Sequence, residues 1–196
     1  MKAFIIQTKR FILSKMTDGD QEKYYALSCN ENVMKFVTGH ALTRKESDEM
    51  YEDFLYENRS KNYMGRYFIE DRLNGDLIGA VKLDKIGNEI EIGYRIQEEH
   101  WGKGIATEIA TDLISFAHQK LKAKNIIAFV NVKNAASIRV LEKAGMENIA
   151  TINDIDEVKY KFSYFTPKDT GVKKIVSATL EFISDGLKGI KEVLDR

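Results

Sequence analysis

Residues 100–108 read His-Trp-Gly-Lys-Gly-Ile-Ala-Thr-Glu (HWGKGIATE), and this stretch decides the fold. It follows an alternating polar and apolar run, EIEIGYRI at 89–96, which is typical of a strand. It leads into a segment with apolar residues at helical spacing, which predicts a helix from about Gly104 to Leu121. The Gly-Lys-Gly turn therefore stands where a strand passes into the N-terminus of a helix.

The glycines in this turn predict a site for a phosphate group. The first N–H groups of a helix have no partner inside the helix, and they carry about half a positive charge. Gly102 and Gly104 place no side chain over these donors, and Lys103 adds a cation beside them. The candidate donors are the main-chain amides of Gly102, Lys103, Gly104, Ile105 and Ala106. The alternative is a glycine-rich turn that binds nothing, because such turns are common between strands and helices.

The surrounding pattern argues against two common phosphate-binding folds. The chain has no GxxxxGK[ST] segment, which a P-loop NTPase needs, and no GxGxxG with an acidic residue about 20 positions later, which a dinucleotide fold needs. Apolar runs at 66–71 and 77–84 flank Asn74-Gly75, which predicts a hairpin. Together with the strand at 89–96, they predict three antiparallel strands before the turn.

The remaining segments extend this pattern in both directions. Further strands are predicted at 9–14, 125–132, 147–152 and 157–166. Further helices are predicted up to Leu27, from the Thr43–Glu46 capping box to about Asn58, and from Ala135 to Lys143, while residues 31–37 are ambiguous. The apolar run at 125–132 suits burial on both faces and parallel pairing. The order of elements predicts an α/β (α+β) fold with a mixed, mostly antiparallel sheet and helices on both faces.

The composition is that of a globular protein in a reducing compartment. Of 196 residues, 43% are hydrophobic, and 30 basic side chains balance 30 acidic ones, so neither nucleic acid nor an acidic membrane is an expected partner. Cys29 is the only cysteine, and no run approaches the roughly 18 apolar residues of a membrane span. No HExxH or CxxC spacing occurs, so no metal site is expected. We expect a cytoplasmic protein.

Residues 167–196 have a different pattern from residues 1–166, which form the predicted main domain. One amphipathic helix is predicted after Pro167, with a heptad seam formed by Val176, Leu180, Ile183, Leu187, Ile190 and Leu194. We expect this extension to pack on its own domain or to form a homodimer through residues 172–194. Association with a membrane surface is the alternative, although acidic residues dilute its lysines.

Two segments together carry a family resemblance. EIGYRIQEEHWGKGIATEIATDLISFA at 91–117 and VNVKNAASIRVLEKAGM at 130–146 resemble the GNAT superfamily of acetyl-CoA-dependent N-acetyltransferases. The sequence looks most like the branch that contains the ribosomal-protein N-terminal acetyltransferases, and the resemblance covers about residues 8–166. It implies that the strands at 89–96 and 125–132 pair in parallel at one end and diverge at the other.

The resemblance also implies where acetyl-CoA binds. The family's pyrophosphate motif falls on residues 101–106, with Trp101 where most members have Arg or Gln. The pantetheine arm is expected between the diverging strands, bonded to main-chain groups near Tyr94 and Ile96. Asn134 matches the family asparagine that contacts the arm, and its alternative role is the N-cap of the following helix.

Transfer of an acetyl group to an amine needs a base, an oxyanion donor and a proton for the thiolate. Glu91 is the candidate base, acting through water, and a solvated strand face is the alternative. The main-chain N–H of Ile96 is the candidate oxyanion donor. Many family members use a tyrosine as the acid, and Leu141 stands at that position here. The resemblance implies Ser137 instead, from the Asn-x-x-Ser pattern, and an ordinary first-turn serine is the alternative.

The sequence thus predicts an acetyl-CoA-dependent N-acetyltransferase that acts by direct transfer in a ternary complex. The acceptor is a primary amine, either a peptide N-terminus or a small amine. The family resemblance implies that the segments before the sheet's first hairpin cap the acceptor pocket, and some of Asn30, Glu31 and Phe36 are candidates to line its channel. The rival interpretation is a non-catalytic acyl-CoA-binding or dimerisation module, which the missing tyrosine and the extra helix favour.

Overall fold

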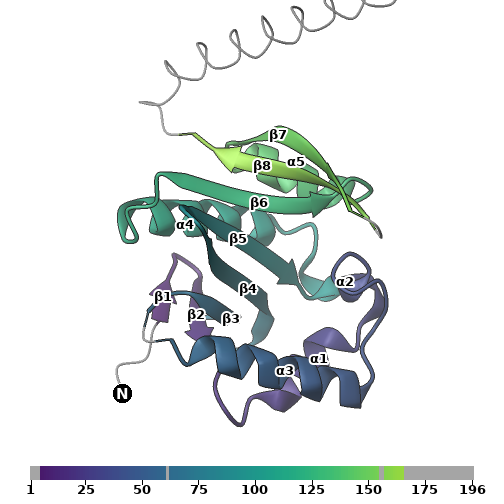
Figure 1. Ribbon diagram of the computed structural model, residues 1–196. Coiled ribbons are helices and arrows are strands. Elements are labelled where there is room, and N and C mark those ends of the chain that lie inside the picture. The colour runs from purple at the N-terminus through teal and green to yellow at the C-terminus, as the bar shows by residue number, and fades with distance from the viewer. Residues whose placement is uncertain (1–4, 61, 155–156, 166–196) are drawn as a thin grey trace, which may run out of the picture. The chain divides into compact units, whose positions relative to one another are not determined.

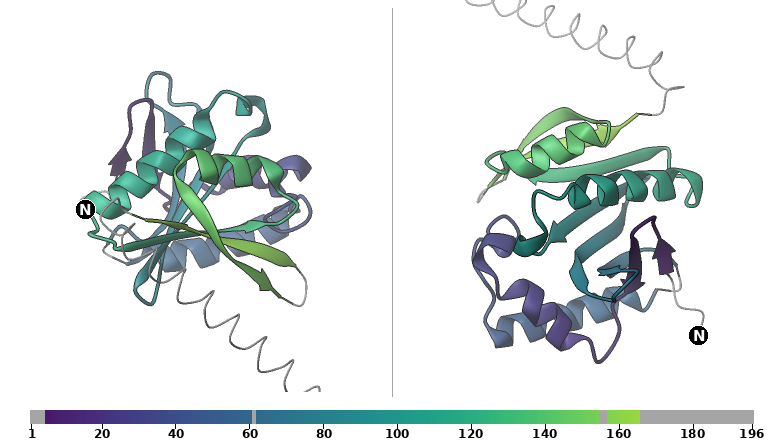
Figure 2. Two further views of the ribbon diagram at one scale, coloured as in Figure 1. Left: turned by 90° about the horizontal axis from the view of Figure 1, so that it is seen from above. Right: turned by 180° about the vertical axis from the view of Figure 1, so that it is seen from behind.

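The computed structural model describes residues 5–60, 62–154 and 157–165, and a single mixed sheet organises them. The predicted C-terminal helix, its heptad seam and the homodimer through residues 172–194 lie outside the described residues and stay predictions. Figures 1 and 2 show the described elements from three sides.

Eight described strands form the sheet in the order β1-β2-β3-β4-β5-β6-β8-β7. Their bounds are β1 Ile5–Gln7, β2 Phe11–Lys15, β3 Gly65–Asp71, β4 Leu77–Ile86, β5 Glu89–Ile96, β6 Asn125–Asn131, β7 Met146–Asn153 and β8 Val158–Tyr164. All neighbours are antiparallel except β5 and β6, which pair in parallel. The mixed, mostly antiparallel sheet with one parallel pair confirms the predicted fold class.

The parallel pair holds together over only three residues on each strand. Glu89, Ile90 and Glu91 of β5 lie opposite Asn125, Ile126 and Ile127 of β6. Beyond Glu91 the ladder between these strands stops, while β5 stays paired with β4 as far as Ile96. We call this divergence of β5 and β6 after Glu91 the splay. Figure 1 shows the two strands separating toward the end of β5.

Helices cover both faces of the sheet. Their bounds are α1 Gln21–Ser28, α2 Glu31–Met34, α3 Arg44–Asn58, α4 Ile105–Gln119 and α5 Ala135–Lys143. Alternate strand residues divide into two apolar clusters, because successive side chains point to opposite faces. Tyr67 and Ile69 pack in the cluster that contains α4, whereas Phe68 packs with α1 and α3. The Gly-Lys-Gly turn before α4 and the helices α1 and α3 therefore belong to opposite faces of the sheet.

Local sequence signals account for several element ends. Thr43 and Glu46 form the predicted capping box at the start of α3, with both reciprocal hydrogen bonds present. Gly145 follows α5 with φ of 84°, as expected for a glycine that ends a helix. The ambiguous segment 31–37 contains the short helix α2, which Asn30 caps through its side chain.

The N-terminal strand pair is the main feature that the sequence analysis missed. The strand predicted at 9–14 is β2, and β1 precedes it as an unpredicted partner. The turn between them contains neither glycine nor proline. Thr8 closes it instead, since its hydroxyl oxygen accepts from the main-chain N–H of Phe11 at 3.0 Å. Side-chain closure of this kind leaves no strong turn signal in the sequence.

Candidate functional site

The Gly-Lys-Gly turn leaves the N-terminus of α4 open. Gly104 is the N-cap residue, with φ of 73° and ψ of 2°, and it makes no side-chain cap hydrogen bond. Gly102 also has φ of 73°, and a Cβ built on either glycine would meet nothing within 4 Å. Glycine adopts this left-handed conformation without steric cost. The first amides of a fifteen-residue helix thus face open space, as the anion-site prediction requires.

Main-chain groups of β5 point into the splay. Gln97 donates its N–H to the carbonyl of Ile78 at 2.9 Å, so these two residues form a hydrogen-bonded pair of the β4–β5 ladder. Hydrogen-bonded and non-bonded pairs alternate along antiparallel strands, so the N–H and C=O groups of Tyr94 and Ile96 point away from β4. The indole Nε1 of Trp101 donates to the Ile96 carbonyl at 2.8 Å. The N–H of Ile96 and both main-chain groups of Tyr94 remain directed into the splay.

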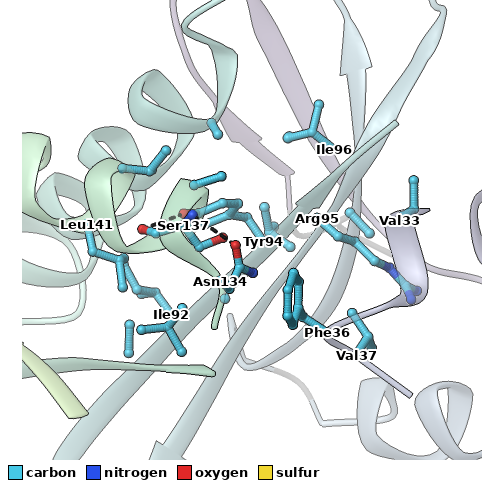
Figure 3. A pocket seen from close by; sticks show the side chains of 18 of the residues that line it. Val33, Phe36, Val37, Ile92, Tyr94, Arg95, Ile96, Asn134, Ser137 and Leu141 are labelled. Atoms are coloured by element: carbon cyan, nitrogen blue, oxygen red, sulfur yellow. Dashed lines mark hydrogen bonds between the residues drawn. The ribbon is translucent and has the colours of Figure 1, made fainter. Parts of the chain in front are cut away.

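One cavity of about 910 Å³ joins the turn, the splay and the helices of the opposite face. It brings together nearly all of the predicted site residues: Glu91, Tyr94, Ile96, Trp101, Gly102, Gly104, Ile105, Ala106, Asn134 and Ser137. Lys103 is the exception, because its exposed side chain is not part of the cavity wall. Figure 3 shows the labelled residues of α5, β5 and α2 around this space.

The first turn of α5 borders the splay. The side-chain oxygen of Asn134 accepts from the main-chain N–H of Ser137 at 3.1 Å, so Asn134 is the N-cap of α5. Its amide nitrogen has no hydrogen-bond partner among the residues that the structure describes. One side chain can therefore cap the helix with its oxygen and offer its nitrogen to the cavity. Leu141, at the position of the family tyrosine, is buried in the same wall.

The side chain of Tyr94 lies beside Ser137, which the sequence analysis did not anticipate. Its hydroxyl stands 3.5 Å from the Ser137 carbonyl oxygen (Figure 3). Burial raises the pKa of Tyr94 to about 12, and its contact with Ser137 opposes this shift. The phenol therefore keeps its proton at neutral pH. Two hydroxyl groups, those of Tyr94 and Ser137, consequently belong to this end of the cavity wall.

Glu91 is the last residue of β5 before the splay, and it is buried. Its carboxylate forms an ion pair with the ammonium of Lys82 on the neighbouring strand β4. Lys82 also stands 3.6 Å from Asp84. Both Glu91 and Lys82 line the cavity, so the carboxylate is not part of a solvated strand face. Lys82 was not predicted from the sequence, because the strand pattern does not reveal which residue of β4 lies beside Glu91.

The wall opposite α5 comes from α2 and the residues that follow it. Val33, Phe36 and Val37 line the cavity together with Arg95 of β5 (Figure 3). Of the three predicted channel residues, only Phe36 does so. The amide of Asn30 instead donates to Glu98 at 3.0 Å, and Glu31 accepts from the N–H of Ala41 at 2.7 Å.

Three further observations concern the cysteine, metal binding and membrane-spanning helices. Cys29 is a free, exposed cysteine. Within residues 5–60, 62–154 and 157–165, no three His, Cys, Asp or Glu side chains come together as a metal site. In the same ranges, no helix has the length and apolar character needed to cross a membrane.

Comparison with known proteins identifies the family. Residues 10–147 match the model of the acetyltransferase (GNAT) domain. The chain is 32% identical over 179 residues to YoaA, an uncharacterised N-acetyltransferase of Bacillus subtilis (strain 168), and the match covers 88% of this chain and 96% of YoaA. The chain therefore belongs to the GNAT family and is an N-acetyltransferase. This family assignment confirms the resemblance seen in the sequence and favours the enzyme over a non-catalytic module.

Solved structures share the fold at low sequence identity. The ribosomal-protein-S5-alanine acetyltransferase from Vibrio fischeri has a TM-score of 0.69 and 15% identity, with 83% of this chain and 97% of that chain covered. The spermidine N-acetyltransferase from Vibrio cholerae, solved with CoA and spermine, has a TM-score of 0.64 and 22% identity, with 80% and 95% covered. These two relatives act on different acceptors, so the fold alone does not determine the acceptor of this chain.

We expect Gly104→Val to weaken acetyl-CoA binding at least roughly 10-fold, because the side chain would cover amides that donate to an anion. Isothermal titration calorimetry measures the dissociation constant. Gly75→Val is the matched control, since Gly75 has φ of 76°, open space at its Cβ position and no part in the cavity. Equal losses in the two variants would show that backbone strain, and not the covered amides, causes the effect.

Proposed function

We propose that this enzyme takes acetyl-CoA as its donor and transfers the acetyl group directly to a primary amine within a ternary complex. The observation that carries this proposal is the continuity of the open α4 N-terminus with the unpaired edge of β5. A diphosphate suits the first feature, since helix N-termini bind anions. An extended amide-containing arm suits the second, because it can add to an exposed strand edge as another strand would.

The described residues fit acetyl-CoA both at the N-terminus of α4 and along the unpaired edge of β5. Gly102 and Gly104 place no Cβ over the amides that would hold the diphosphate. Tyr94 offers a main-chain donor and acceptor to the arm, and the free amide nitrogen of Asn134 adds a donor from α5. Bound acetyl-CoA supplies the activated acetyl group, and the residues below supply orientation and proton transfer.

Glu91 is the proposed base. An amine is mostly protonated at pH 7 and must lose a proton before it attacks the acetyl carbon. The buried carboxylate faces the cavity at the root of the splay, and the Lys82 ion pair holds it in place. Glu91 receives the first amine proton through water and passes it to the solvent, and it receives the second as the carbon–nitrogen bond forms and the carbon–sulfur bond breaks.

Ser137 is the proposed proton donor to the departing thiolate. Its hydroxyl belongs to the first turn of α5, beside the splay where the thioester is expected. The protonated phenol of Tyr94 is the other hydroxyl in this wall. The proton that Ser137 gives to sulfur is balanced by the one that Glu91 takes from the amine, so water can restore both groups. The N–H of Ile96 is the proposed donor to the carbonyl oxygen.

We expect the wild-type protein to release free thiol from acetyl-CoA when a suitable primary amine is present. A screen of amines and peptide N-termini with a thiol-reactive dye measures this release, and mass spectrometry identifies the acetylated product. Binding of acetyl-CoA without thiol release for any acceptor would contradict the proposed reaction.

Ser137→Ala should lower kcat by roughly 10²-fold while the acetyl-CoA dissociation constant changes little. If Tyr94→Phe lowers kcat by this factor and Ser137→Ala leaves kcat unchanged, the proton donor is Tyr94 and not Ser137.

We expect Glu91→Gln to lower kcat by roughly 10²-fold at pH 7, and we expect a smaller decrease in kcat at higher pH. As the pH approaches the pKa of the amine, a larger fraction of the amine is already neutral and does not need Glu91 to remove its proton. A pH–rate profile from pH 6 to about pH 10 measures the effect. A loss that stays constant across this range would contradict the base role and would point to a structural role for the Lys82–Glu91 ion pair.

A further inference from the structure

An arginine without an ionic partner faces the cavity. Arg95 stands on β5 on the same sheet face as Glu91, and its side chain reaches toward α2, among Val33, Phe36 and Val37 (Figure 3). Its guanidinium carbon lies 4.8 Å from the centroid of the Tyr24 ring. Its Nη1 stands 3.0 Å from the sulfur of Met34. In the part of the chain that the structure describes, no carboxylate forms an ion pair with it.

Two neighbouring cations of the cavity wall, Arg66 and Lys82, differ from Arg95 in this respect. Arg66 contacts both Asp84 and Glu57, the second at 3.1 Å. Lys82 contacts Glu91 and Asp84. Among the described residues, the Arg95 guanidinium contacts an aromatic face and a thioether, and a thioether is a weak acceptor for a group with five N–H donors. The half-buried guanidinium of Arg95 therefore has N–H donors available to an anion in the cavity.

The other residues of the cavity wall indicate what kind of molecule would bring an anionic group to Arg95. Phe36 and Val37 are 37% and 53% exposed, so they offer apolar surface at the cavity rim. Glu91 is the only carboxylate among the lining residues, against six basic ones: Lys35, Arg66, Lys82, Arg95, Lys143 and Lys159. Arg66, Lys82 and Lys159 are ion-paired with carboxylates, and no ion pair is seen for Lys35, Arg95 and Lys143 among the described residues. A polyamine would bring further positive charge against this wall. The wall instead suits a molecule with an anionic group and an apolar body.

We propose that Arg95 binds a carboxylate of the acceptor, and that the acceptor is a small primary amine with a carboxylate and an apolar side chain, such as an apolar amino acid. This inference rests on the proposed function, since it places the reacting amine toward Glu91 in the same cavity. A peptide N-terminus has an amide at the position of the α-carboxylate and would leave the charge of Arg95 unpaired. Planar guanidinium groups match carboxylates through two parallel hydrogen bonds.

The test compares matched acceptors that differ only at the carboxylate. Leucine is compared with leucinamide and isoamylamine, and phenylalanine with phenylalaninamide and phenethylamine, by kcat/KM for thiol release. We expect the wild-type enzyme to prefer each amino acid by roughly 10- to 100-fold, as for hydrogen bonds to charged groups. Arg95→Met should abolish this preference, and Arg95→Lys should restore only part of it, because lysine lacks the planar fork.

Arg59→Met is the matched control variant. The Arg59 guanidinium also stacks on a tyrosine, with its carbon 5.3 Å from the Tyr56 ring centroid, but Arg59 does not line the cavity. We expect this variant to keep the wild-type preference. Thermal unfolding and acetyl-CoA calorimetry show whether each variant is folded.

Two results would overturn the inference. One is a wild-type enzyme that acetylates the amides or the decarboxylated amines as well as the amino acids. The other is an Arg95→Met variant that keeps the preference. If no amine releases thiol, the proposed reaction has failed, and calorimetry of leucine against isoamylamine with the CoA-loaded protein then tests the Arg95 site by itself. Equal affinity of these two probes, or weaker binding of leucine, would contradict the carboxylate site.

Discussion

The site depends on main-chain hydrogen-bonding groups that the fold leaves without partners. Two sets of such groups lie next to each other, at the glycine turn before α4 and along β5 after Glu91. Polar main-chain groups in a folded protein are normally hydrogen-bonded, because a buried group without a hydrogen-bond partner costs free energy. The divergence of β5 from β6 prevents that pairing inside the chain. A ligand with a diphosphate and an amide-containing arm can supply the missing partners.

The chemistry around this path comes from side chains on both faces of the sheet. The turn before α4 and the first turn of α5 contribute the groups assigned to the donor and to the thiolate. The residues of α2, with Glu91 and Arg95, contribute those assigned to the amine. Because β5 carries Tyr94 toward one face and Arg95 toward the other, a single strand connects the donor half to the acceptor half.

The sequence predicted the donor half better than the acceptor half. The turn at 101–106 and Asn134 follow from local patterns, since a glycine at a helix start and an Asn before a helix act through their own main chain. Tyr94 was predicted through its main chain, but the positions of its side chain and of Lys82 and Arg95 depend on which side chains meet in the fold, and strand alternation gives only the face. The short helix α2 was ambiguous because four residues are too few for a periodic signal. The strand β1 has only three residues and a turn closed by Thr8.

We propose that the amides at the start of α4 hold the diphosphate of coenzyme A, and the rest of the site depends on this contact. The most direct measurement is a titration of the ¹⁵N-labelled protein with CoA, followed through the amide resonances of residues 102–107. We predict large shifts of these resonances with CoA and much smaller ones with pantetheine, which has the arm but lacks the diphosphate. Unchanged resonances for Gly102, Gly104 and Ala106 at saturating CoA would contradict it.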